Sequence, residues 1–155
     1  YTGSFSVYAA DGGAKSTTTV DLSWKYLDWA QRNMALNGFE SENHTYVQSD
    51  IREYLQSLPQ EELFDLAIVD PPTFSNSKST EEDWVIQQHY PELLNSMINR
   101  LRPGGVIYFS TNYRRFKFDD SFIRGNCHEI SRQTVPEDFR NKRIHRCWRI
   151  EKYAD

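Results

Sequence analysis

Three aspartates each stand at the end of a short apolar, β-branched run. Asp21 ends the run 15–21, Asp50 follows the run 45–49, and Asp70 follows the run 64–69. A carboxylate only accepts hydrogen bonds, and its two oxygens suit a pair of hydroxyl groups or an amino group. In open α/β sheets, ligands bind at the carboxyl ends of the strands. One such aspartate is usually a turn or cap residue, but three in order indicate a ligand site.

The first two aspartates differ in the ligand that they predict. Asp21 has the position to accept hydrogen bonds from two ribose hydroxyls, a role found in dinucleotide enzymes and in methyltransferases alike. Asp50, one strand further out, can accept from an adenine amino group, which favours S-adenosylmethionine. The alternative for both is simple capping of the helix that follows. The dinucleotide fingerprint GxGxxG is absent, which makes an NAD-dependent oxidoreductase the weakest interpretation.

The chain opens with Tyr1-Thr2-Gly3-Ser4 before an alanine-rich helix that ends at Gly12-Gly13. A glycine at such a turn allows a close approach of the backbone to a ligand, and a helix N-terminus favours an anion.

The segment Asp70-Pro71-Pro72-Thr73-Phe74 is the sharpest feature of the sequence. The two prolines stiffen the backbone and remove donors directly after a predicted buried strand. Phe74 then offers a surface on which a flat base can stack, an interaction of about 1–3 kcal/mol per base. The alternative is a rigid turn with Phe74 packed into the core.

The remaining pattern predicts an α/β fold, because short strands alternate with amphipathic helices around a parallel sheet. We expect the run 64–69 to be buried on both faces. Helices are predicted over 24–36, with Ser23 as N-cap and Asn37-Gly38 as the stop, over 51–58, and over 84–101, with a break or a fresh start near Pro91. Residues 102–105 form a predicted turn before a strand over 106–110. Further strands are predicted over 127–133 and 144–151, the second closing the sheet.

The composition indicates one soluble domain over residues 1–155, with 38% hydrophobic and 26% charged residues and no repeat or linker. No membrane span or secretory signal is recognisable, and Cys127 and Cys147 form no CxxC pair, so we expect a cytoplasmic protein without metal. The oligomeric state is open. Residues 1–97 carry 5 Lys and Arg against 15 Asp and Glu, whereas residues 98–155 carry 13 against 7. The basic C-terminal third is either a landing surface for a polyanion or a solvated face.

These motifs resemble the C-terminal half of the bifunctional large-subunit ribosomal RNA methyltransferases of bacteria, the half that methylates guanine N7. The resemblance is carried by YTGSFSVYAADGGAKSTTTVDLS (1–23), YLDWAQRN (26–33), DPPTFSNSK (70–78), LRPGG (101–105), YFSTNYRRFK (108–117) and IHRCW (144–148).

The resemblance implies a Rossmann-like, class I methyltransferase sheet with helices on both faces, S-adenosyl-L-methionine as cofactor and 23S ribosomal RNA as partner. It places the cofactor pocket at Tyr1, Thr2, Gly3, Ser4, Asp21, Leu22, Ser23, Asp50, Ile51 and Asp70. The catalytic loop that it implies holds Asp70, in a positioning role, with Pro71, Pro72 and Phe74, and RNA is met by Arg114, Arg115 and Lys117.

In that family a strand of the type VLNLF precedes the YTG segment. The resemblance therefore implies that this chain is an N-terminally truncated catalytic domain, without the first, central strand of the sheet. It also implies that a preceding RNA-binding region and the other methyltransferase half are absent.

The residues also narrow the range of methylation reactions that fit this chain. Methylation at C5 of cytosine needs a cysteine nucleophile, and neither the loop after residue 70 nor the loop 110–117 contains one. Guanine N7 has a lone pair and needs no general base, so catalysis can rest on proximity and alignment. His89 and His145 are candidates for a base, but a lone histidine is more often structural. The alternatives are a methyltransferase for another base or a small molecule, and a non-catalytic module that binds RNA or protein.

Overall fold

The computed structural model describes residues 2–75, 84–141 and 144–153. These residues form two compact units, residues 1–57 and residues 58–155, and each unit is described by itself. That the whole chain is a single domain stays a prediction.

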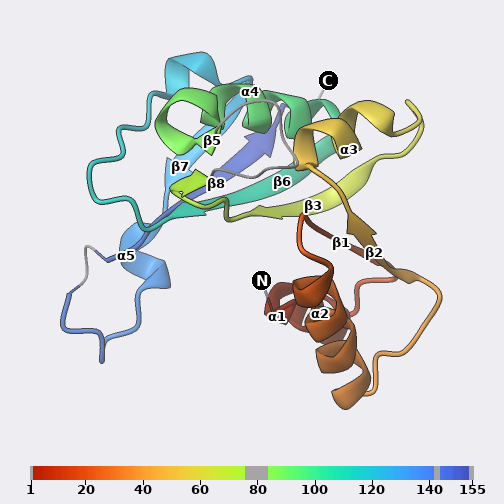
Figure 1. The fold of residues 1–155 in the computed structure, drawn as a ribbon. Helices are drawn as coiled ribbons and strands as arrows, with labels where there is room; N and C mark the ends of the chain where they lie inside the picture. Colours follow the sequence, from red (N-terminus) through yellow and green to blue (C-terminus); the bar gives the residue numbers. More distant parts are fainter. Residues whose placement is uncertain (1, 76–83, 142–143, 154–155) are drawn as a thin grey trace. The chain divides into compact units, whose positions relative to one another are not determined.

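The first unit pairs two short parallel strands with helices (Figure 1). Its elements are α1 (Ser4–Asp11), β1 (Thr17–Asp21), α2 (Trp24–Leu36), β2 (His44–Gln48) and α3 (Ile51–Ser57). β1 and β2 run parallel, with Asp21 opposite Gln48. α2 buries Leu27, Ala30 and Met34, and this i, i+3, i+7 spacing is the stripe that the sequence predicted. Both bounds of α2 agree with the prediction, as does the stop at Asn37.

The second unit contains a four-stranded mixed sheet in the order β3-β6-β8-β7. Its elements are β3 (Phe64–Val69), β4 (Phe74–Ser75), β5 (Trp84–Val85), α4 (Ile86–Asn99), β6 (Leu101–Thr111), the 3-10 helix η1 (Asp120–Phe122), β7 (Gly125–Glu129), α5 (Ser131–Thr134) and β8 (Arg146–Lys152). β3 and β6 are parallel, whereas β8 is antiparallel to both β6 and β7. The sequence pattern predicted a parallel sheet, but the pairing of β8 makes this sheet mixed.

The core of the second unit lies where α4 covers one face of this sheet (Figure 1). The side of α4 that is buried carries Ile86, Tyr90, Leu93, Leu94, Met97 and Ile98. Phe109 of β6 is fully buried. Its ring lies 5.7 Å from the rings of both Phe116 and Trp148 and 6.2 Å from that of Tyr90. Aromatic contacts therefore join the helix, two strands and the loop after β6.

Two predictions about burial and helix continuity were wrong. β3 was expected to be buried on both faces, yet Leu66 and Ile68 are 46% and 39% exposed. Residues i and i+2 lie on the same face of a strand, so one face of β3 is open. The helix over 84–101 was expected to break near Pro91, but α4 begins at Ile86 and runs through Pro91. Burial of Tyr90, Leu93 and Leu94 on either side of the proline offsets its cost of about 3 kcal/mol.

Three predictions of strand extent also need correction. Residues 102–105, which were predicted as a turn, belong to the first part of β6. The register of the pairing between β6 and β3 shifts in this part. The strand over 127–133 ends as β7 at Glu129, and Ser131–Thr134 form the short helix α5. The strand over 144–151 does not close the sheet, because β8 is hydrogen-bonded on both sides and the half-exposed β7 takes the edge.

Among the described residues, we find no helix with the length and apolar character that a bilayer crossing requires.

Replacing Phe109 by alanine is expected to cost about 3–5 kcal/mol of unfolding free energy, because the fully buried ring leaves a cavity. Urea unfolding followed by tryptophan fluorescence measures this loss. The matched control is Phe122→Ala, since Phe122 is 60% exposed, and we expect it to change stability by less than about 0.5 kcal/mol. Equal losses in the two variants would contradict the assigned core.

Candidate functional sites

In the first unit, two of the predicted aspartates lie at one edge of the two-stranded sheet. Asp21 is the last residue of β1, and Asp50 comes two residues after the end of β2. The Ser49 backbone N–H donates to the Asp21 carbonyl at 3.2 Å, so the two strand ends stay side by side. The structure therefore brings these two acids together, as expected for parallel neighbours.

The Asp21 side chain shapes the turn into α2. Its Oδ1 accepts a hydrogen bond from the Ser23 backbone N–H at 2.7 Å, the local pattern typical of an aspartate turn. Ser23 occupies the N-cap position, as predicted, although its side chain makes no capping hydrogen bond. Leu22, between the two residues, is exposed. The Asp21 carboxylate is thus held in a fixed orientation by the backbone.

Asp50 is largely buried and is engaged by Arg52. Its Oδ1 accepts from the Arg52 backbone N–H at 2.7 Å and from Arg52 Nε at 3.2 Å. Burial raises the pKa of Asp50, but the hydrogen bonds and charge of Arg52 outweigh it, and the net pKa lies below the ordinary value. The helix-capping contact that we considered is therefore present. Each carboxylate oxygen can accept more than one hydrogen bond, so capping does not exclude a further donor.

The turn before α1 needs glycine for two structural reasons. Gly3 has φ +73° and caps α1, and a side chain on it would collide with the Cβ of Ala30 in α2. Asn33 of α2 also donates to the Thr2 carbonyl at 2.8 Å. No described side chain caps α1, and the first-turn amides of a helix have no partner within the helix itself. Tyr1 lies outside the described residues, Ser4 is exposed, and Ile51 is half-buried at the start of α3.

In the second unit, Asp70 directly follows β3 and is fixed by the neighbouring strand. Ser110 Oγ of β6 donates to Asp70 Oδ1 at 2.7 Å. The two residues meet because β3 and β6 are parallel with Val69 opposite Phe109. Ser110 is a site residue that we missed, although the adjacency of the two strand ends was a usable signal.

The loop after Asp70 is held from three directions. Trp84 Nε1 donates to the Pro72 carbonyl at 2.8 Å, and Thr73 Oγ1 donates to Asn112 Oδ1 at 3.3 Å. The Ile86 backbone N–H also donates to the Thr73 carbonyl at 3.2 Å. Phe74 is 55% exposed, so the alternative of a core-packed ring is wrong. A rigid loop therefore presents an aromatic face to solvent.

Trp84 and Asn112 were also missed, because no sequence pattern links them to a loop that lies more than ten residues away. Trp84 is buried, and its ring lies 5.4 Å from that of His89. The Nδ1 atom of His89 in turn lies 3.0 Å from the backbone of Val85. His89 therefore makes structural contacts with Trp84 and Val85. The rest of the motif, residues 76–78, lies outside the described residues.

The two cysteines are poor nucleophiles for a different reason from the one that the sequence offered. Cys147 of β8 lies opposite Ser110, so the fold brings a thiol to the vicinity of Asp70. Burial, and then the Asp70 charge, raise the pKa of this thiol. Burial, and then the charge of Asp120, raise the pKa of Cys127 to about 11. Both residues are therefore protonated at neutral pH, which disfavours nucleophilic attack.

The predicted RNA-binding residues lie on the loop after β6. Arg114, Arg115 and Lys117 are all exposed. Gln87 of α4 holds the loop backbone, since its side chain accepts from the Lys117 N–H at 2.8 Å and donates to the Lys117 carbonyl at 2.9 Å. Arg146 donates to the Phe116 carbonyl at 2.8 Å. The loop is thus anchored while its cationic side chains face solvent.

Arg146 is itself fixed by Glu129. Its Nε and Nη2 donate to the two carboxylate oxygens of Glu129 at 2.9 Å each, a bidentate arrangement. Its guanidinium carbon lies 4.5 Å from the ring centroid of Trp148. The hydrogen bonds from Arg146 lower the pKa of Glu129, against a smaller opposing effect of burial. Among the described residues, no group of acids, cysteines and histidines is arranged to hold a metal.

Residues 1–139 match the family described as S-adenosylmethionine-dependent methyltransferase. The chain is 51% identical over 152 residues to "Ribosomal RNA large subunit methyltransferase K" of Neisseria meningitidis, covering 97% of this chain and 43% of that protein. It is 50% identical over 153 residues to "Ribosomal RNA large subunit methyltransferase K/L" of Methylococcus capsulatus, covering 97% of this chain and 21% of that protein. The chain thus spans less than half of these relatives.

Solved structures share the fold. SMU.776, crystallised in complex with SAH, superimposes with a TM-score of 0.81 at 26% identity, over 97% of this chain and 43% of that one. A SAM-dependent methyltransferase from Agrobacterium tumefaciens gives a TM-score of 0.74 at 22% identity, over 100% of this chain and 54% of that one. The expected Rossmann-like methyltransferase fold is confirmed.

The Glu129–Arg146 pair predicts an acid-dependent loss of stability. Because the pKa of Glu129 is lower in the folded chain than its ordinary value of 4.5, the unfolded chain binds more protons at acid pH. The contribution of Glu129 is therefore complete above about pH 4.5 and is lost as the pH falls through the folded pKa. Urea unfolding of the wild type and Glu129→Gln between about pH 3 and 7 should give free energies that converge at low pH.

The control for this measurement is Glu137→Gln, which removes the same charge from an exposed position. Its difference from the wild type should stay constant over the same pH range. A constant difference for Glu129→Gln as well would show that the ion pair contributes nothing to stability.

Proposed function

Since the chain belongs to the S-adenosylmethionine-dependent methyltransferases, we propose that it methylates RNA, at N7 of a guanine in 23S ribosomal RNA of the large subunit. The observation that carries this proposal is the 51% identity to a ribosomal RNA large subunit methyltransferase over 97% of the chain. These relatives are much longer than this chain, and we propose for the chain only the methyl transfer itself.

The residues of the first unit fit the proposed cofactor. The uncapped first turn of α1 offers backbone donors to the carboxylate of its amino-acid part. Asp21 accepts from the two ribose hydroxyls, in an orientation fixed by the Ser23 amide. Asp50 accepts from the adenine amino group, and its low pKa keeps it ionised at neutral pH. The donors and acceptors therefore match the three polar parts of the molecule.

The residues of the second unit fit a flat base. Phe74 provides the stacking face, and Pro71 and Pro72 keep the backbone stiff beneath it. Asp70, held by Ser110, is a positioning residue that can accept from amino or imino groups of the base. The links from Trp84 and Asn112 prevent the loop from adapting its shape to other ligands.

Guanine N7 needs little chemical help from the protein. When bound, S-adenosylmethionine supplies an electrophilic methyl group. The attacking lone pair of N7 is already available, so no side chain has to remove a proton before the transfer. The absence of a low-pKa cysteine at Asp70 argues against attack on a carbon atom of a pyrimidine. The residues therefore act by orienting the base, which can account for several kcal/mol of rate enhancement.

Cofactor binding can be measured by calorimetric titration with S-adenosylhomocysteine. Asp21→Ala is expected to weaken binding at least about tenfold, because a hydrogen bond to a charged group is worth about 1.5–3 kcal/mol. Asp21→Asn keeps an acceptor for the Ser23 amide but loses the charge, so it should weaken binding without disturbing the turn. The control is Asp28→Ala, an exposed acid on α2 paired with Arg32. If Asp21→Asn binds as tightly as the wild type, the ribose assignment fails.

Methyl transfer can be measured with 23S ribosomal RNA that lacks the modification and with cofactor carrying a labelled methyl group. Digestion and mass spectrometry should reveal 7-methylguanosine. Asp70→Ala should slow the transfer about tenfold to a hundredfold, because misplacing the base has costs of this order. The control Asp65→Ala changes an 81% exposed acid of β3, the strand that Asp70 follows.

Each other outcome of this measurement contradicts the proposal in a distinct way. A different methylated nucleoside would overturn the N7 assignment. Binding of S-adenosylhomocysteine without methyl transfer to any RNA would favour the alternative of a non-catalytic module.

A further inference from the structure

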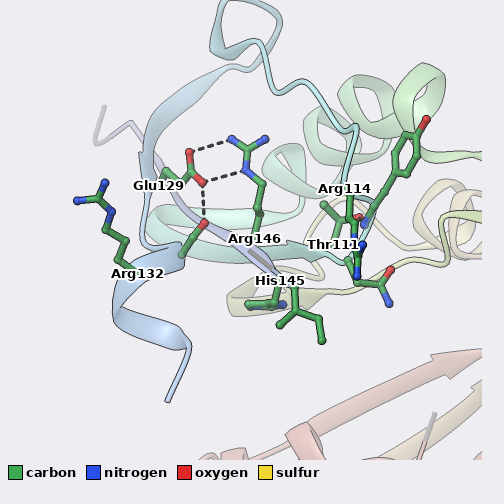
Figure 2. A pocket seen from close by; sticks show the side chains of 10 residues that line it. Thr111, Arg114, Glu129, Arg132, His145 and Arg146 are labelled. Atoms are coloured by element: carbon green, nitrogen blue, oxygen red, sulfur yellow. Dashed lines mark hydrogen bonds and ion pairs between the residues drawn. The ribbon is translucent and has the colours of Figure 1, made fainter. Parts of the chain in front are cut away.

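A cavity of about 510 Å³ opens at the ends of three elements of the second unit. Its walls come from the end of β6 and the loop after it, from the end of β7 with the start of α5, and from the residues at the start of β8 (Figure 2). The lining residues are Thr111, Asn112, Tyr113, Arg114, Glu129, Ser131, Arg132, Ile144, His145 and Arg146. The volume is of the size that small ligands occupy.

The charges of this pocket do not cancel. The negative charge of Glu129 is taken up by Arg146, through two hydrogen bonds of 2.9 Å. Arg114 and Arg132 are exposed, and neither has a hydrogen bond or an ion pair with another described residue. The charge of Arg132 also acts on Glu129, but the lining holds three arginines and this one acid. The pocket therefore keeps a net positive charge, which favours an anion.

The walls of the pocket are fixed by hydrogen bonds. Ser131 Oγ donates to Glu129 Oε1 at 2.6 Å and accepts from the Cys147 backbone N–H at 3.0 Å. Thr111 Oγ1 accepts from the Tyr113 backbone N–H at 3.1 Å, which sets the direction of the loop that bears Arg114. The two free guanidinium groups are thus carried by preorganised backbone, which lowers the entropic cost of binding.

The arrangement of the two cations suits a chain of anionic groups better than one small anion. Arg114 follows β6 and Arg132 belongs to α5, and Figure 2 shows them on opposite sides of Arg146. In this view His145 lies between the two arginines (Figure 2), and the exposed Ile144 also lines the pocket, so a planar ring and an apolar side chain accompany the two charges. An RNA strand presents such groups, because successive phosphates are separated by a sugar, and each sugar carries a base.

We propose that this pocket binds the sugar–phosphate backbone of the RNA strand, with Arg114 and Arg132 each contacting one phosphate. This inference rests on the proposed function for the identity of the polyanion. It adds Arg132, His145 and the Glu129–Arg146 pair to the RNA-binding loop that the sequence predicted. Glu129 acts here as a positioning residue, because it directs Arg146 to the loop backbone instead of to the ligand.

Binding of a fluorescein-labelled single-stranded RNA, followed by anisotropy at several salt concentrations, tests the pocket. Each phosphate contact on a single strand contributes about 0.7 to the slope of log K against log salt. Arg114→Ala and Arg132→Ala should each lower this slope by about 0.7 and weaken binding about fivefold at 0.1 M salt. The double variant should lose about 1.4 of the slope. Arg132→Lys should restore most of it, because a lysine also neutralises a phosphate.

The matched control is Arg124→Ala. Arg124 is an exposed arginine that directly precedes β7, whereas Glu129 of the pocket ends that strand. Only its backbone N–H is hydrogen-bonded to Asn95, and alanine keeps that group. We expect the wild-type slope. Near-ultraviolet circular dichroism of every variant should match the wild type.

Three results would overturn the inference. Wild-type slopes for both Arg114→Ala and Arg132→Ala would show that no phosphate is held there. An equal loss of slope for Arg124→Ala would show that RNA is attracted by the surface as a whole. Displacement of the RNA by inorganic phosphate at low millimolar concentration would also overturn it, because it would indicate a site for a single small anion.

The salt-dependence experiment and the methyl-transfer experiment can fail independently of each other. If methyl transfer to RNA is observed while the slopes stay unchanged, the pocket inference alone fails. If the slopes fall as expected but no methyl group is transferred, the pocket binds RNA and the proposed activity fails.

Discussion

The hydrogen-bonded pairing of β6 on both of its edges is the constraint on which the second unit depends. On one edge the parallel ladder with β3 brings Ser110 to Asp70. On the other edge the antiparallel ladder with β8 places Thr111 opposite Arg146. Because side chains alternate along a strand, a slip of one residue would turn Phe109 out of the core and Ser110 away from Asp70. Burial of the Phe109 ring therefore fixes both the loop after Asp70 and the pocket that we propose for RNA.

Several polar side chains have a local structural contact at the position where we propose a ligand. Asp21 accepts the Ser23 amide, Asp50 accepts from Arg52, and Ser110 donates to Asp70. Such contacts hold each carboxylate in one orientation before a ligand arrives, which reduces the entropy lost on binding. Capping and ligand binding are therefore not competing explanations for these residues. The Glu129–Arg146 pair follows the same logic, since it immobilises the wall of the pocket.

The sequence predicted the elements whose signals are local. The helix Trp24–Leu36 was found to the residue, because its apolar spacing and its stop are encoded within one stretch. The strand Phe64–Val69 was found for the same reason, but its predicted burial was wrong, since burial depends on which elements cover the two faces of a strand. The continuity of α4 through Pro91 also escaped prediction, because the core contacts that offset the proline come from distant strands. The end of β7 at Glu129 likewise depends on its pairing with β8.

The residue types of the candidate sites were determined by the sequence alone: acids at strand ends, a stiff proline loop with an aromatic face, and a basic C-terminal third. Only the tertiary structure decided which partners these residues have. It brought the Ser110 hydroxyl into a hydrogen bond with Asp70, and the Trp84 indole into one with the Pro72 carbonyl. It also brought Cys147 near Asp70 as a buried, protonated thiol. It also gathered Arg114, Arg132 and His145 around one cavity. Acids at strand ends can be recognised in the sequence because each follows directly after its own strand. A pocket built from three separate segments cannot, because it forms only when the strands pair.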